Sequence, residues 1–254
     1  MVDYSRMKLG KAPVRRDART FLFAKYFDST KLPAIPPSLS WAEKVSVWGM
    51  MLNDNVGDCT CAAAGHLIEL WTANNGNETV PPDPIILGAY EVISGYDPNT
   101  PANDPGAVEL DVLKYWRTTG IGQDKIQAFV GLDEKNTDHV RASVYLFGGC
   151  YIGLRLPNSA QTQDVWSVPP GGPTGDGLPG SWGGHAVPIV AYDTSSATVV
   201  TWGQLKKMTW EFYTTYCDEA YALLSQDWSQ PGRLTPAGFD FVGLQADLQA
   251  VAGP

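Results

Sequence analysis

The sequence lacks several features that would each place it in a well-defined class. Its 254 residues contain no run of about 18 apolar residues, so no membrane-spanning helix is expected. It also has no excess of basic residues: 18 lysines and arginines stand against 27 acidic residues, and the net charge of −9 argues against a nucleic-acid surface. Because 44% of the residues are hydrophobic and only 18% are charged, the chain is globular and not disordered.

Cysteine is scarce, and no leader-like segment is visible. Four cysteines stand at positions 59, 61, 150 and 217, and the first two are too close for an unstrained bridge, so no disulfide framework is expected. The basic first 25 residues have neither the apolar core nor the small-residue cleavage site of a signal peptide. The sequence therefore predicts a cytoplasmic protein.

The order of the patterns indicates an α+β protein in which helices come first and strands later. Residues 1–31 form a basic, proline-punctuated arm, and 32–254 form the main domain. Within that domain we expect a helical half over about 32–122, a β-rich half over about 123–228 and a tail at 229–254.

The expected elements follow from apolar spacing and from turn residues. Helices are expected at 59–74, 85–94, 108–119 and 138–147, and strands at 125–131, 150–156, 186–192, 197–202 and 221–224. The run 157–184 is rich in glycine, proline and serine and leads directly to His185. We expect it to be a long connection that walls or covers a cleft.

Two residues combine the features of a nucleophile and its base. A cysteine attacks as a thiolate, so it needs a neighbour that lowers its pKa. Cys59 follows Gly57 and Asp58, which is a typical N-cap residue, and therefore lies on the first turn of the expected helix, where the dipole favours a thiolate. Among the three histidines, only His185 lies where an exposed loop enters an apolar strand. Cys59 and His185 are therefore the candidate catalytic pair.

Five segments in register resemble the papain-like cysteine peptidases. They are Leu39-Ser-Trp41, Asn53 six residues before Cys59, Gly57-Asp58-Cys59-Thr60-Cys61-Ala62, Gly184-His185-Ala186-Val187 and Thr201-Trp202-Gly203. The resemblance covers roughly residues 32–225 and is to a divergent member of bacterial or phage type. It implies the papain-like fold, with the active-site cleft between the helical half and an antiparallel β half.

The resemblance also implies roles for the matching residues. Asn53 stands where the family has the amide of the oxyanion hole, and the substrate-binding positions fall on Gly57, Asp58, Gly184 and Trp202. The position that orients the catalytic histidine falls on Val200, whose side chain cannot do so. Thr201, the next residue, can accept a proton from His185 if the strand register is shifted. No cofactor and no metal is implied.

These residues predict a cysteine hydrolase of amide or peptide bonds that works through an acyl-enzyme. Its partner would be a peptide or protein substrate, not nucleic acid or a membrane, and nothing in the residues specifies an oligomeric state. Val200 keeps a second hypothesis open, an inactive papain-like domain that binds a peptide or protein partner. A third, an accessory protein of a mobile element or particle, has less support.

A metal site is the remaining alternative. Cys59, Cys61 and His66 could serve as three zinc ligands, but a fourth ligand and paired cysteine knuckles are missing. We expect Cys61 and His66 to be core residues instead.

Overall fold

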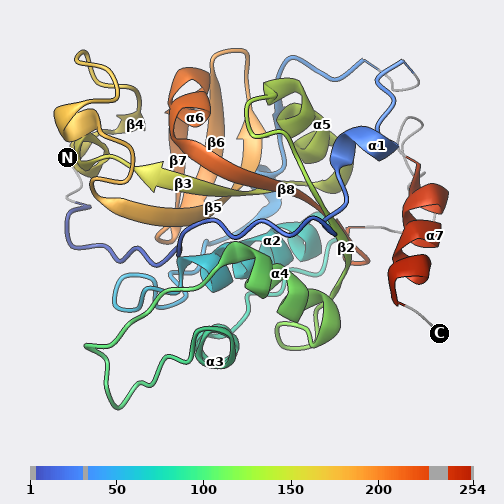
Figure 1. Cartoon of the computed structure of the whole chain (residues 1–254), viewed down its shortest axis with the longest axis horizontal. Helices are drawn as coiled ribbons and strands as arrows, with labels where there is room; N and C mark the ends of the chain where they lie inside the picture. Colours follow the sequence, from blue (N-terminus) through green and yellow to red (C-terminus); the bar gives the residue numbers. More distant parts are fainter. Residues whose placement is uncertain (1–3, 31–33, 229–239, 253–254) are drawn as a thin grey trace.

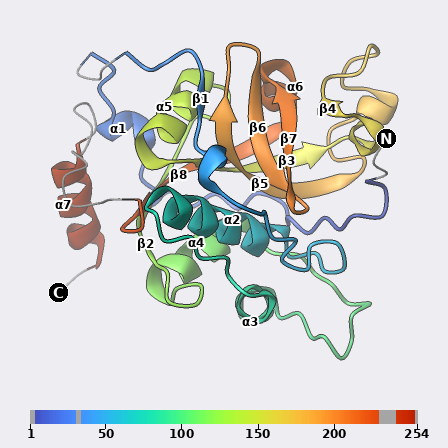
Figure 2. The ribbon, with the colours of Figure 1, turned by 180° about the vertical axis from the view of Figure 1, so that it is seen from behind.

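The computed structural model describes residues 4–30, 34–228 and 240–252, and these form two layers (Figure 1). The lower layer in Figure 1 holds helices α2 (Cys59–Asn74), α3 (Asp83–Ser94) and α4 (Glu109–Thr118). Above it lies a sheet, covered on its far side by α5 (Thr137–Phe147) and α6 (Trp210–Tyr216). The reverse view gives the same arrangement (Figure 2). The expected α+β architecture is confirmed.

The sheet has eight strands in the order β2-β8-β3-β5-β6-β7-β4, with β1 paired to the end of β5. Every pairing is antiparallel except that of the short β4 with β7. The strands are β1 (Leu39–Ser40), β2 (Ile126–Gly131), β3 (Cys150–Leu156), β4 (Val165–Trp166), β5 (Gly183–Tyr192), β6 (Ser196–Thr201), β7 (Gln204–Thr209) and β8 (Cys217–Ser225). The central strand β5 carries the candidate base.

Each face of the sheet has its own apolar core, because successive strand residues point to opposite faces. Val187 and Ile189 of β5 belong to the core shared with α5 and α6, whereas Ala186 and Val190 belong to the core shared with α2, α3 and α4. The central strand is therefore fixed from both sides, which holds the residues at its start in place.

Helix α2 is buried along nearly its whole length. It is rich in alanine and apolar residues, and of its sixteen residues only Thr72 is not fully buried. A helix that is apolar all round belongs inside a protein, and small side chains let it approach a sheet closely. Asp58 is the N-cap residue as expected, but its side chain makes no capping hydrogen bond, and only its backbone carbonyl receives the N–H groups of Cys61 and Ala62. The predicted N-cap position is therefore confirmed, and the cap is made by the backbone alone.

The sequence located most of the expected elements to within three residues, and three regions differ more. The 157–184 connection contains short structured pieces, namely the 3-10 helices η2 (Asn158–Thr162) and η3 (Gly175–Gly177) and strand β4. The mixed segment after residue 204 divides into β7 and α6, and the strand expected at 221–224 begins at Cys217. In the predicted tail, 229–239 lies outside the described residues and Phe241–Ala252 forms α7.

Part of the N-terminal arm lies inside the molecule and not on its outer surface. In both views its first part runs between the sheet and the helical layer, below β5 and beside α2 (Figures 1 and 2). It then climbs to a short helix α1 (Phe23–Tyr26) near α5. The other short helix, η1 (Ala42–Lys44), follows β1. Within the described residues, no helix is long and apolar enough to cross a membrane.

Candidate active site

Cys59 opens helix α2 against the start of strand β5. Its side chain is 1% exposed, and its sulfur receives the backbone N–H of Ala186 at 3.4 Å. Ala186 follows His185 directly, so the N-terminus of α2 and the start of β5 meet at the Cys59 thiol. The first N–H groups of a helix have no partner inside the helix, and the backbone N–H of Cys59 is one of them.

The His185 ring is held on one nitrogen and on one face. Nε2 lies 2.7 Å from Oγ1 of Thr201, and the ring stacks on the indole of Trp202 with centroids 4.7 Å apart and planes 20° from parallel. Among the described residues, Nδ1 has no hydrogen-bond partner. If Nε2–H donates to Thr201, the lone pair of Nδ1 is left to accept a proton.

Both residues that contact the His185 ring, Thr201 and Trp202, lie at one tight turn. Thr201 pairs with Gln204 across the β6–β7 hairpin, so Trp202 and Gly203 are the two turn residues. Both have positive φ values, 47° and 68°, as a two-residue turn of type I′ requires. Glycine adopts this backbone freely, but a tryptophan at positive φ is unusual and marks a constrained position. Val200, at the position where the family has its orienting residue, is buried in the core on the α2 side.

Burial sets the protonation states of the pair. It raises the pKa of the Cys59 thiol to about 12, although the backbone N–H groups of Ala186 and Gly10 lower it in part. It lowers the pKa of His185 to about 3, and His66 adds to this shift. At neutral pH both groups are therefore uncharged in the structure described, and a thiolate–imidazolium pair requires better solvation of the site.

The remaining predicted residues surround this pair. Asn53 is buried, donates its side-chain N–H to the carbonyl of Val56 at 3.1 Å and also favours the charged form of Asp58. For Asn53 to donate to an oxyanion, one of these contacts must be given up. The Gly57 N–H donates to Asp104 at 2.6 Å, which fixes the loop ahead of the nucleophile. The Asp58 side chain is fully buried, so it lines no exposed surface here.

The proposed zinc ligands do not come together. His66 bonds the carbonyl of Gly49 at 2.8 Å through Nε2 and packs edge-on to Trp48. Cys61 is fully buried in the core shared with the helices. In the described part of the chain, no group of three His, Cys, Asp or Glu side chains is placed to bind a metal ion.

The arm occupies the space in front of the nucleophile. The N–H of Lys8 donates to the carbonyl of Asn53 at 3.3 Å, and the indole N–H of Trp202 donates to the carbonyl of Lys8 at 3.2 Å. Further along, Lys11 donates to the carbonyl of Gly184 at 3.1 Å. Residues 8–11 thus bond to both halves of the molecule and lie between them, across the cleft that the sequence predicted.

The opposite edge of the arm is bonded as well. Ala107 donates its N–H to the carbonyl of Gly10 at 2.8 Å and accepts the N–H of Ala12 at 2.9 Å, so Lys11 and Ala107 form a parallel bridge. A Cβ on Gly10 would overlap the carbonyl of Gly57. Several other glycines would also meet the arm if they carried a Cβ: Gly57, Gly106, Gly153, Gly183 and Gly184.

The arm meets the thiol with a backbone N–H. The backbone N–H of Gly10 interacts with the Cys59 sulfur, while the Gly10 carbonyl is bonded to Ala107. A thiolate attacks a carbonyl carbon, whose oxygen must point to the oxyanion donors. The Gly10 carbonyl oxygen is therefore held by Ala107 and not by an oxyanion donor.

The residues through which the arm is held between the two halves of the molecule were not identified from the sequence. Gly10, Lys11, Asp104 and Glu109 were not singled out, nor was the acidic pair Asp218-Glu219 on β8. Adjacent acidic residues inside an otherwise apolar strand were the one available signal, because charged side chains are rarely buried without a partner. The 157–184 connection, which was predicted to wall or cover the cleft, supplies Trp166 and Trp182, which pack against Trp202.

The two-layer fold and the order of its elements define a structural class: the chain has the fold of the papain-like cysteine proteases. Xylellain, a cysteine protease from Xylella fastidiosa, matches with a TM-score of 0.66 at 16% identity, over 88% of this chain and 98% of that one. Digestive procathepsin L 3 from Tenebrio molitor larval midgut matches with a TM-score of 0.58 at 11% identity, covering 87% and 77%. Procathepsin B S9 from Trypanosoma congolense matches with a TM-score of 0.57 at 11% identity, covering 89% and 88%.

The comparisons of the sequence itself give no further information on the class of protein. No protein-family model matches the sequence, and the comparison with curated proteins gives no match. At identities of 11–16% the structural similarity establishes the fold and not the activity.

Replacing Thr201 tests whether its hydroxyl supports the His185 ring. We expect Thr201→Val, which keeps the shape of the side chain, to lose about 1–3 kcal/mol of unfolding free energy, because it leaves a buried ring nitrogen without its partner. Thr201→Ser should recover most of this loss. Thr198→Val on the same strand, at a half-buried position, is the control and should change little. Urea unfolding measures all four proteins, and equal values for both valine variants would refute the role of the hydroxyl.

Asp58 should make the stability of the protein depend on pH. Burial raises its pKa to about 8, whereas in the unfolded chain it ionises near pH 4, at about the ordinary value. Between these values the unfolded state binds fewer protons, so the contribution of Asp58 to the unfolding free energy falls as pH rises from about 4 to 8. Asp58→Asn should remove this contribution, and its stability relative to wild type should therefore increase from pH 5 to pH 8. Urea unfolding across this range checks it. The exposed Glu43→Gln is the control, and parallel curves for wild type and Asp58→Asn would show the idea to be wrong.

Proposed function

We propose that the protein is a cysteine hydrolase of amide or peptide bonds, held inactive in the state described by its own N-terminal arm. The observation that carries the proposal is the support of His185 by Thr201 and Trp202 at the point where the opening turn of α2 presents Cys59. A buried cysteine that served only for packing would need neither a histidine oriented through Nε2 nor a stacked indole.

The residues can perform the reaction in the following order. Nδ1 of His185 takes the proton of the Cys59 thiol, and the sulfur attacks the substrate carbonyl. The oxyanion that forms is held by the backbone N–H of Cys59 and by the amide of Asn53, once that amide turns from its present partner. His185 then gives its proton to the leaving amine, and water releases the acyl group with His185 as base.

The closed state explains why both groups are neutral. Burial is the largest cause of both pKa shifts, and the arm contributes to it by covering the Cys59 sulfur. Displacing residues 8–12 would let water reach the pair, which lowers the pKa of the thiol and raises that of the imidazole. The arm therefore separates a dormant from a reactive state without changing any residue of the pair.

A binding function remains the second candidate. The cleft of this protein already holds an extended peptide segment along both edges, as a peptide-binding domain without catalysis would. Such a domain gains nothing from a reactive thiol, so the reactivity of Cys59 in an opened cleft separates the two candidates.

A single methyl group can open the cleft in the full-length chain. The added Cβ of Gly10→Ala would overlap the Gly57 carbonyl, so the arm must leave its seat. We expect iodoacetamide at pH 7 to label Cys59 about ten-fold faster or more in this variant than in wild type. Peptide mapping locates the label, and trypsin cleavage after Lys8 and Lys11 reports that the arm has moved.

Two controls make the result specific. Gly171→Ala adds the same methyl group where nothing lies within 4 Å, and it should label as slowly as wild type. Adding His185→Ala to Gly10→Ala should abolish the fast labelling. If trypsin shows a displaced arm but Cys59 stays slow, or labels equally fast without His185, the hydrolase proposal fails and the binding domain takes its place.

A further inference from the structure

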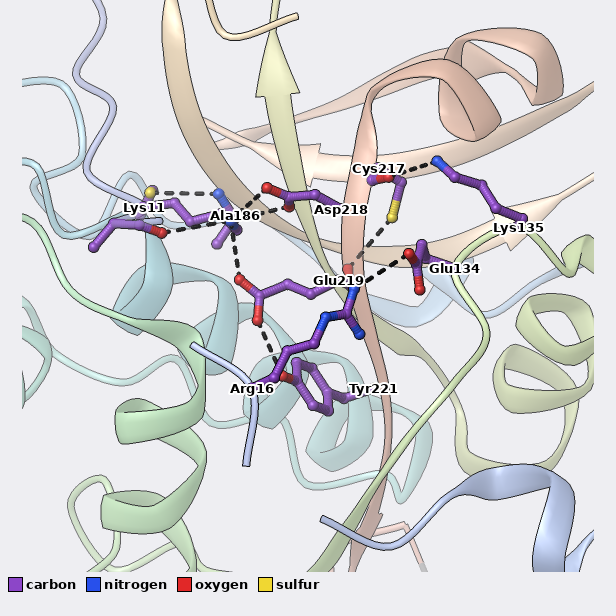
Figure 3. Close-up of polar contacts among 11 residues, drawn as sticks. Lys11, Arg16, Glu134, Lys135, Ala186, Cys217, Asp218, Glu219 and Tyr221 are labelled. Carbon is purple, nitrogen blue, oxygen red and sulfur yellow. Dashed lines mark hydrogen bonds and ion pairs between the residues drawn. The ribbon is translucent and has the colours of Figure 1, made fainter. Parts of the chain in front are cut away.

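Beside the nucleophile lies a pocket that buries a lysine among carboxylates. The Lys11 ammonium is 3.0 Å from Asp218 Oδ1 and 2.9 Å from Glu219 Oε1, and the lysine side chain is 1% exposed. Figure 3 shows this ammonium between Asp218 and Glu219, with the Tyr221 hydroxyl bonded to the other oxygen of Glu219 at 3.0 Å. Burial disfavours the charged lysine, but the carboxylates of Glu109, Glu219 and Asp218 outweigh it and raise its pKa.

The pocket has one more carboxyl group than those that pair with Lys11. Glu109 at the start of α4 is fully buried, and neither of its carboxylate oxygens has a hydrogen-bond partner among the described residues. Its charge acts on Lys11, and burial together with Glu219 raises its own pKa. Buried carboxylates without hydrogen bonds are costly, so a site that keeps one beside an ion pair is suited to a cation with several donors.

The walls of the pocket are shaped for a long unbranched stem. Gly153 on β3 pairs with Glu219 on β8, and a Cβ at this position would overlap Cε of Lys11. The same Cβ would come within 2.7 Å of Glu109 Oε1 and 2.8 Å of Glu219 Cγ. Any other residue at 153 would therefore close the channel that leads to the carboxylates.

The pocket holds the arm residue next to the one that lies at the thiol. Gly10 occupies the place over Cys59, and Lys11, the next residue, enters the pocket while its backbone bonds to Gly184 on one side and bridges Ala107 on the other. A peptide extended along the same two edges would direct one side chain into the pocket when its neighbour lies at the thiol.

We propose that the pocket formed by Glu109, Asp218 and Glu219 selects substrates with a lysine or arginine side chain next to the residue whose carbonyl Cys59 attacks. Lys11 of the arm occupies this position in the closed state and must leave for a substrate to bind. The inference rests on the proposed hydrolase function, because it names the substrate class of that same site. Neutral side chains leave Asp218 and Glu219 without a cationic partner, and acidic ones add repulsion, so both are disfavoured.

The test uses the full-length Gly10→Ala protein and four internally quenched peptides. Each has glycine at the attacked position and lysine, arginine, norleucine or glutamate directly after it, in the order in which Lys11 follows Gly10; norleucine has the stem of lysine without its ammonium. We expect kcat/KM for lysine and arginine to exceed that for norleucine about ten-fold or more, and that for glutamate by a larger factor. Glu219→Gln should reduce the preference for lysine over norleucine several-fold. Glu134→Gln, whose carboxylate pairs with Arg16 outside the pocket, should leave the preference unchanged.

The outcomes separate this inference from the proposed function. If all four substrates are hydrolysed at similar rates, or if the preference survives Glu219→Gln, the proposed selectivity of the pocket is refuted. The proposed hydrolase function is unaffected by either result. If no substrate is cleaved and Cys59 does not label, the proposed hydrolase function is refuted. The preference of the pocket for a cation is then tested by binding alone.

Binding is measured on full-length Lys11→Ala, whose missing side chain leaves the pocket without its cation. We expect n-butylammonium to raise the melting temperature of this variant in a saturable way, and to raise it far less in wild type, where Lys11 occupies the pocket. The matched uncharged probe, 1-butanol, should have no such effect. Equal effects of both probes, or none from either, would show that the pocket has no preference for cations and would end the proposal.

Discussion

The contact between α2 and β5 is the constraint on which the candidate active site depends. A helix of alanines and apolar residues can lie close to a sheet, and this closeness brings the first turn of α2 to the start of β5, where the Ala186 N–H reaches the Cys59 sulfur. Cores on both faces of the sheet fix β5, so His185 has little freedom. Its orientation then comes from one hairpin turn, which supplies a hydroxyl to Nε2 and an indole to the ring face.

The arm belongs to the same packing and is not an appendage. Its backbone bonds to both halves of the molecule, and its Lys11 neutralises part of a buried acidic pocket. Removing one partner of a buried ion pair leaves the other charged and unsolvated, which typically costs about 3–5 kcal/mol. The arm can therefore leave only if something else satisfies the pocket, such as water or a second cation. This links the release of the arm to the chemistry of what replaces it.

The sequence predicted the features that are encoded locally. The glycine near Cys59 and the apolar strand after His185 are short-range patterns, so these elements were placed closely. Thr201 was predicted as an alternative to Val200. The hairpin that presents Thr201 was not predicted, because its second strand, β7, lies in a segment of mixed polar and aromatic residues. The acidic pocket was not predicted, because Lys11 and Asp218 are 207 positions apart and neither has a periodic pattern around it. Asp58 shows a different limit: its type and position favour a side-chain cap, but the fold buries the carboxyl away from the helix N–H groups.

The arm covers the thiol with a backbone N–H and directs the carbonyl of the same residue elsewhere. The Gly10 N–H lies at the sulfur, and the Gly10 carbonyl is bonded to Ala107 on the far side. The thiol is therefore covered by a group that cannot react with it, while burial keeps the sulfur protonated and the imidazole neutral. In the proposed function both barriers would disappear in one step, because displacement of the segment would uncover the sulfur and admit the water that stabilises the charged pair. The closed state thus needs no damaged catalytic residue, only a glycine that lets the backbone lie flat against Gly57.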